Sequence, residues 1–156
     1  MRRFKMTGRE SKEHNDLFFV CSLIEYIGRK TKNHRNVVVN AIGKNKLQHI
    51  YELADVYHSE NIDKITDDLI REYHIDNGTF DNVANGQYLI PTHWDIGKVY
   101  KRLIVDICNK QGKEPVDTLI EVYNSWISRK IEDFNSSLYY ENPDYLYESY
   151  IKGEVL

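Results

Sequence analysis

Apolar residues recur along most of this chain at the three- and four-residue spacing of one face of an α-helix. In the first such segment Leu17, Val20, Cys21, Ile24 and Ile27 form one stripe. No window alternates apolar and polar residues with the period of a strand. We therefore predict an all-α fold, a compact bundle of six to seven helices without a significant sheet. The predicted helices cover residues 11–30, 34–42, 46–58, 62–73, 93–111, 115–134 and 143–152.

Side chains that accept hydrogen bonds from free backbone N–H groups stand where several of these helices should begin. Asn33, Asn45 and Asn142 are the predicted N-caps of three helices. Thr92 and Asp95 have the spacing of a capping box, with Asp in place of the usual Glu or Gln. These signals place helix starts near residues 34, 46, 93 and 143.

The length of 156 residues fits one domain, so we expect a single helical domain over 1–156. Residues 75–91 carry the turn signals Asn77-Gly78 and Asn85-Gly86 and form a long loop. This loop joins two subdomains, 11–74 and 92–153, which should share one core because neither is large enough to be stable alone. A loop of this length is either functional or a connector.

The sequence favours a cytoplasmic location. No apolar run is long enough to span a membrane, and the basic start Met1–Lys5 is not followed by a signal-peptide core. Both cysteines, Cys21 and Cys108, fall on apolar helix faces and are interpreted as buried thiols of a reducing compartment.

Charge is distributed unevenly between the two parts of the chain. Residues 1–50 contain 11 Lys/Arg and 4 Asp/Glu, a net charge of +7, whereas residues 51–156 carry −10. The asymmetry indicates either two surfaces that attract different partners or two halves that neutralise each other within the fold.

Residues 16–72 resemble a family of small helical bacterial domains without an assigned biochemical activity. The resemblance rests on Glu25-Tyr26 at the end of the first helix, on the short helices that follow, and on Tyr57-His58 and Asp67-Asp68. Genes of that family often lie beside genes for ADP-ribosyltransferase-like toxins. The resemblance therefore implies an accessory or antitoxin-type role.

Two patterns bear on enzyme chemistry. Arg29 and His34 have a spacing that resembles the catalytic motif of HEPN ribonucleases, in which the arginine stabilises phosphate charge and the histidine transfers protons. A predicted helix break separates the two residues. Glu52, Asp55 and His58 step around one helix face, which more often is a solvated face than a metal site. We expect no catalytic residues, no bound metal and no cofactor.

A basic cluster surrounds the predicted second helix. Helices 34–42 and 46–58, with Gly43 between them, have the order of a helix-turn-helix, whose cations would contact DNA phosphates. The alternative is a helical hairpin with a solvated basic edge. The residues of the candidate nucleic-acid surface are Arg29, Lys30, Lys32, Arg35, Lys44 and Lys46.

The last part of the chain is rich in tyrosine and acidic residues, a composition that suits binding to a basic protein surface. The alternative is that the tyrosines pack the last helix onto the body. The candidate protein-binding residues are Tyr139, Tyr140, Glu141, Asp144, Tyr147 and Glu148.

The leading hypothesis is a non-enzymatic protein-interaction module, an antitoxin-like or accessory protein whose partner is another protein, such as a toxin. A DNA-binding regulator that uses the basic N-terminal half is the first alternative. A HEPN-like ribonuclease is the second.

Overall fold

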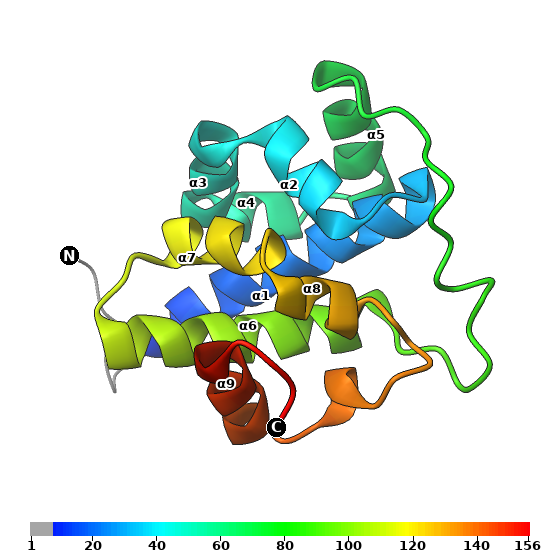
Figure 1. Cartoon of the computed structure of the whole chain (residues 1–156). Helices are drawn as coiled ribbons and strands as arrows, with labels where there is room; N and C mark the ends of the chain where they lie inside the picture. Colours follow the sequence, from blue (N-terminus) through cyan, green and yellow to red (C-terminus); the bar gives the residue numbers. More distant parts are fainter. Residues whose placement is uncertain (1–7) are drawn as a thin grey trace.

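The computed structural model describes residues 8–156, with side chains from residue 12 onward, so the basic start Met1–Lys5 lies outside the described residues. The described part is helical and contains no strand, which confirms the all-α prediction. Figure 1 shows the helices in chain order. They are α1 (Gly8–Thr31), α2 (Arg35–Ile42), α3 (Lys44–Glu52), α4 (Ala54–His58), α5 (Ile62–Glu72), α6 (His93–Gln111), α7 (Pro115–Tyr123), α8 (Trp126–Ile131), the 3-10 helix η1 (Leu138–Tyr140) and α9 (Pro143–Lys152).

The two longest helices, α1 and α6, form the most extensive helix–helix contact of the molecule (Figure 1). They approach closely at Gly97 of α6, which lies against Ser22 of α1. A Cβ atom added to Gly97 would lie 2.1 Å from Ser22 Oγ and 2.8 Å from the Ser22 backbone nitrogen. The absence of a side chain at Gly97 therefore sets the distance between the two central helices.

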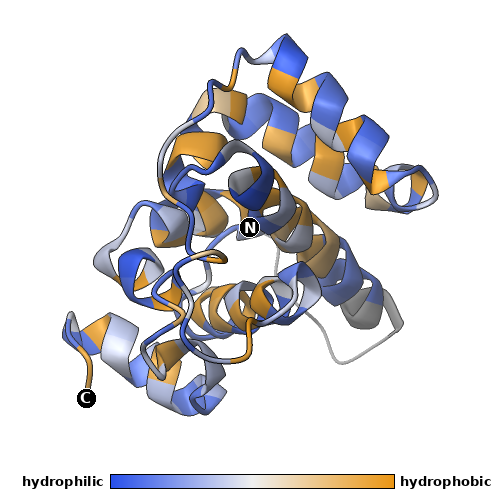
Figure 2. Cartoon of the chain, turned by 90° about the vertical axis from the view of Figure 1, so that its right-hand side faces the viewer, coloured by the Kyte–Doolittle hydropathy of each residue, from blue (hydrophilic) through white to orange (hydrophobic). Residues whose placement is uncertain are grey.

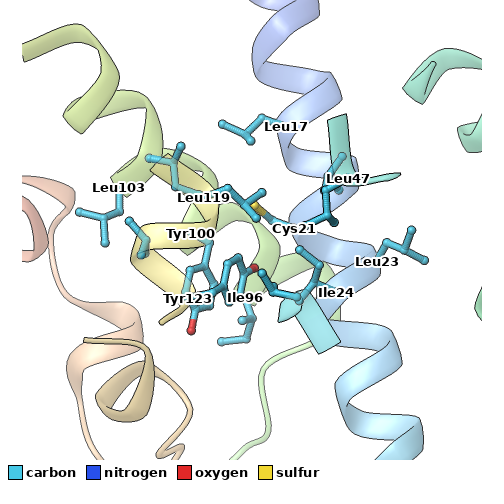
Figure 3. Close-up of a cluster of buried hydrophobic side chains, with 14 of the residues drawn as sticks. Leu17, Cys21, Leu23, Ile24, Leu47, Ile96, Tyr100, Leu103, Leu119 and Tyr123 are labelled. Carbon is cyan, nitrogen blue, oxygen red and sulfur yellow. The ribbon is translucent and has the colours of Figure 1, made fainter. Parts of the chain in front are cut away.

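One continuous hydrophobic core contains residues from both predicted subdomains. Figure 3 shows Cys21 and Ile24 of α1 beside Tyr100 of α6 and Tyr123 of α7. The two tyrosine rings stack with centroids 4.1 Å apart. Both cysteines are free and buried, as predicted, and burial raises the pKa of Cys21 to about 12 and that of Cys108 to about 11.

Helix starts follow the sequence signals at some positions and not at others. The capping box is present, because Thr92 accepts from the N–H of Asp95 and Asp95 accepts from the N–H of Thr92. Asn142 caps α9 by accepting from the N–H of Asp144 at 2.8 Å. The predictions at Asn33 and Asn45 were wrong, since His34 precedes α2 and Gly43 precedes α3.

Two helices predicted as continuous are each divided. The third breaks at Leu53, so that Ala54 is buried and Leu53 is exposed. The sixth breaks at Asn124 and Ser125. Asn124 donates to the carbonyl of Ile120, and Ser125 donates to that of Val122. Side chains that bind the carbonyls of the last turn compete with continuation of the helix.

The helices carry both apolar and polar residues, as the hydropathy colours in Figure 2 show. None of the helices in the described part of the chain is both long enough and apolar enough to cross a membrane.

Candidate functional site

A network of charged and amide side chains lies buried between α1, α2, α8 and the long loop. Arg35 is fully buried, and Glu25, Glu132 and Asn82 are also buried. Arg35 donates through Nε and Nη2 to the two carboxylate oxygens of Glu25, at 2.9 and 2.8 Å. A two-bonded pair of this kind compensates part of the large cost of removing both charges from water.

The remaining hydrogen bonds of Arg35 connect four segments of the chain. Its Nη1 donates to the carbonyl of Asn33 at 2.7 Å, and its Nη2 donates to Asn82 Oδ1 at 3.1 Å. Its backbone N–H donates to Glu132 Oε2 at 2.8 Å. Asn82 in turn donates to the carbonyl of Glu132 at 3.0 Å. The network therefore ties the loop and the end of α8 to the junction of α1 and α2.

The local sequence makes room for this network. Glu25 lies on α1, and Arg35 is the first residue of α2. Gly28 lies beneath the arginine, where an added Cβ would be 2.4 Å from Arg35 Cδ. Only glycine at this position lets the guanidinium reach Glu25 along its present path.

The first part of the long loop is fastened to the end of α1. The backbone N–H of Gly78 donates to Thr31 at 2.8 Å, and that of Phe80 donates to Lys32 at 2.9 Å. The ring of Phe80 stacks on His34, with centroids 3.9 Å apart. Backbone and ring contacts thus hold this segment in one position.

The second part of the loop is fastened by Asn135, which follows α8. Asn135 Oδ1 accepts from the N–H of Gln87 at 2.8 Å, and Asn135 Nδ2 donates to the carbonyl of Asn85 at 3.2 Å. In Figure 1 the loop, in green, runs down to the segment around η1, in orange. The loop is therefore an ordered structure that positions Tyr88 and Leu89.

Glu132 gives the network a specific pH dependence. Burial raises the pKa of its carboxyl, whereas the hydrogen bond from the Arg35 backbone N–H lowers it by a smaller amount. A raised pKa in the folded state gives stability that is complete below the unfolded-state pKa and is lost as pH rises through the folded-state value.

We expect Glu132→Gln to remove this dependence. From about pH 4 to about pH 7, the wild type should lose stability relative to the variant, because only the wild type must ionise a buried carboxyl. Thermal melts of both proteins across this range measure the difference. Asp133→Asn, at an exposed neighbouring carboxylate, is the control and should show no such trend. A difference that is constant with pH would contradict the prediction.

The loop and the helix η1 carry aromatic and aliphatic side chains at the surface. We call Tyr88, Leu89, Tyr139 and Tyr140 the tyrosine surface. Leu89 is 92% exposed, and Tyr88 and Tyr140 are each 68% exposed. Tyr139 packs edge-on against Phe134 and Tyr140, with centroids at 5.7 and 5.0 Å. Tyr88, Tyr139 and Tyr140 line a cavity of about 310 Å³ together with Phe134, Asn135, Ser136 and Ser137.

The chain around this surface is strongly acidic. Residues 132–148 contain five Asp or Glu and no Lys, Arg or His. Asp144 and Glu148 are exposed and Glu141 is partly exposed. None of these three carboxylates forms an ion pair with a described residue. Carboxylates without an ion-pair partner among the described residues would attract a basic group.

The structure divides the predicted protein-binding residues. Tyr139, Tyr140 and Glu141 border the cavity or follow it directly. The expectation that Tyr147 is displayed was wrong, because its side chain is buried and the ring lies 4.0 Å beneath Lys110 Nζ. Tyr147 thus packs α9 onto α6.

The predicted basic cluster is divided between buried and exposed positions. Arg35 is fully buried, which corrects its assignment to a surface for nucleic acid. Lys46 is partly buried. Other members of the cluster lie beside carboxylates from the second part of the chain, so the two halves neutralise each other at these positions. These pairs are Lys30 with Asp67 at 2.8 Å, Lys32 with Asp81 at 3.9 Å and Lys44 with Asp117 at 2.7 Å.

Arg29 and His34 have different neighbours. Arg29 donates to Glu25 at 2.8 Å and to the carbonyl of Pro91 at 2.7 Å, and so also fastens the loop. His34 Nδ1 lies 3.4 Å from Glu132. The helix break between the two residues is confirmed, since α1 ends at Thr31 and α2 begins at Arg35.

The break at Leu53 also separates Glu52 in α3 from Asp55 and His58 in α4. Within residues 8–156, the described His, Cys, Asp and Glu side chains form no group of three that could hold a metal ion.

The buried network was not predicted from the sequence, although a signal was present. Arg35, Val38, Val39 and Ile42 share one helix face, so an arginine occupies the apolar side of α2. The run Tyr88-Leu89-Ile90 is apolar inside a loop and also indicated a special role.

No family model, curated protein or solved structure matches the chain.

Proposed function

We propose that the protein is a non-enzymatic interaction module of the antitoxin or accessory kind, which acts in the cytoplasm and binds a basic partner protein through the tyrosine surface. The observation that carries this proposal is the exposure of Tyr88, Leu89 and Tyr140 on segments that are themselves held in place. The antitoxin element rests on the resemblance of residues 16–72 to a toxin-associated family.

The fixed loop favours binding because no free energy has to be spent on ordering it when a partner binds. Ordering a loop on association consumes part of the binding free energy, and a loop already fixed avoids that loss. Exposed tyrosines offer large contact areas with few rotatable bonds. The cavity beside Tyr139 is of a size that can receive an apolar side chain of a partner.

Charge also favours binding to a basic partner. The carboxylates of Glu141, Asp144 and Glu148 follow the tyrosine surface along the chain and lack ion-pair partners in the described part. Opposite charge on a partner would accelerate association and orient the encounter, and this effect weakens with salt.

The test is affinity capture of the tagged protein from its own host after nuclease treatment, followed by binding measurements with the captured partner. We expect Leu89→Ser combined with Tyr140→Ala to weaken binding at least tenfold, because exposed anchors of this kind dominate interface energies. Val56→Ser is the matched control, since Val56 is 57% exposed on α4. It should leave binding unchanged.

Equal loss in both variants, or no loss in either, would reject the tyrosine surface as the binding site. Capture of partners that requires nucleic acid, and that is lost on charge reversal at Lys32 and Lys46, would instead favour the DNA-binding alternative. RNA cleavage by the purified protein, abolished by His34→Ala, would favour the ribonuclease alternative.

A further inference from the structure

A second cavity, remote in sequence from the tyrosine surface, lies between α1, α4 and the start of α6. Its volume is about 340 Å³, within the range of small-molecule sites. We call it the aromatic cleft. Its lining residues are Asn15, Asp16, Phe18, Phe19, Ala54, Asp55, His58 and Trp94.

Four of the eight lining residues carry rings, namely Phe18, Phe19, His58 and Trp94. Phe18 of α1 packs on Trp94 of α6 with centroids 5.6 Å apart, and Phe19 packs on His58 of α4 at 5.5 Å. Trp94 is 37% exposed and belongs to the first turn of α6, which the Thr92 capping box fixes. The faces of such rings carry partial negative charge and attract cations.

Two carboxylates add a full negative charge to this environment. Asp16 is buried, whereas Asp55 is exposed at the rim. Lys12 bridges them, with Nζ 2.8 Å from Asp16 and 3.2 Å from Asp55. Together the three described side chains Asp16, Asp55 and Lys12 carry a net charge of −1.

The bridge by Lys12 decides which cation fits. The ammonium of Lys12 already lies on Oδ2 of both carboxylates, so a second primary ammonium would have to share these groups with it. A primary ammonium needs several hydrogen-bond acceptors when it leaves water. A quaternary ammonium needs none, and gains from ring faces and from the net negative charge alone.

We propose that the aromatic cleft binds a trimethylammonium group, carried by a small molecule of the choline type or by a trimethylated lysine. Lys12 stays on its two carboxylates, and the ligand's charge neutralises the site. This inference is independent of the interaction proposed for the tyrosine surface, because it uses different residues and a different class of ligand.

The test uses Trp94 as reporter in the full chain, with Trp126→Phe to remove the other tryptophan. Choline and N-ε-trimethyllysine are titrated separately, with 3,3-dimethyl-1-butanol as the neutral control of nearly the same shape as choline. We expect saturable fluorescence change with at least one cation, and about tenfold weaker binding of the neutral alcohol. The tighter of the two cations identifies the source of the group.

Two charge variants should change the affinity for choline in opposite directions, and calorimetry measures both affinities. Asp55→Asn, at an exposed side chain, should weaken choline binding several-fold, and Lys12→Met should strengthen it because it removes the positive charge beside the cleft. Equal binding of choline and the neutral alcohol, absence of saturation with both cations, or the same sign in both variants would overturn the proposal.

Discussion

Arg35→Ala is expected to destabilise the protein by about 3–5 kcal/mol, which is a large part of the total stability of an ordinary domain. The guanidinium is fully buried and makes four side-chain hydrogen bonds, two of them to Glu25. Its removal leaves the buried Glu25 carboxylate without its main partner and leaves Asn82 Oδ1 without its donor. Urea unfolding followed by circular dichroism measures the change.

Two further variants test whether the loss of stability in Arg35→Ala comes from leaving a buried charge unpaired. Lys30→Ala removes the Lys30–Asp67 pair, whose side chains are 43% and 57% exposed, and should cost less than about 1 kcal/mol. Glu25→Met combined with Arg35→Met removes both charges and should be less destabilising than Arg35→Ala. A loss below about 1 kcal/mol for Arg35→Ala would show that the network does not fasten the fold.

Gly97→Ala should destabilise the protein by about 1–3 kcal/mol, although alanine is the better helix former by about 1 kcal/mol. Steric overlap decides the sign. The new Cβ would lie 2.1 Å from Ser22 Oγ, and also 2.8 and 2.9 Å from the Ser22 backbone N and Cα. Backbone atoms cannot rotate away, so α1 and α6 must separate along their shared interface.

Ser22→Gly provides the matched test. In the Gly97→Ala background it removes the Oγ overlap but not the backbone overlap, and should restore only part of the stability. Guanidinium unfolding of the single and double variants measures the coupling between the two sites. An increase in stability for Gly97→Ala alone would mean that the helices adjust freely, contrary to the packing described.

Much of the fold followed from local patterns, because helix faces and caps are encoded by nearby residues. The apolar stripe from Leu17 to Ile27 and the Thr92–Asp95 box gave α1 and the start of α6 directly. The breaks at Leu53 and Asn124 were missed, since an apolar period of about 3.6 residues continues through both. Side-chain competition for backbone carbonyls at Asn124 and Ser125 is visible only in three dimensions.

The candidate sites were harder to predict because they depend on contacts between distant segments. Arg35 belongs to a basic run in sequence but is paired with Glu25 and Glu132, and the latter lies 97 residues away. The tyrosine surface combines a loop residue, Tyr88, with Tyr139 and Tyr140. Tyr139 and Tyr140 lie in the tyrosine-rich segment that predicted an interface, whereas Tyr88 was not among the predicted binding residues.

α1 and α6 lie far apart in the sequence, so they leave the ribosome at different times. α1 ends at Thr31 and α6 ends at Gln111, so a ribosome adds about 80 residues before the main packing partner of α1 is complete. At bacterial or eukaryotic elongation rates this takes roughly 4–16 seconds. During that interval the apolar stripe of α1 has only α2 to α5 to cover it. The nascent chain is therefore most exposed to chaperones and proteases before α6 emerges.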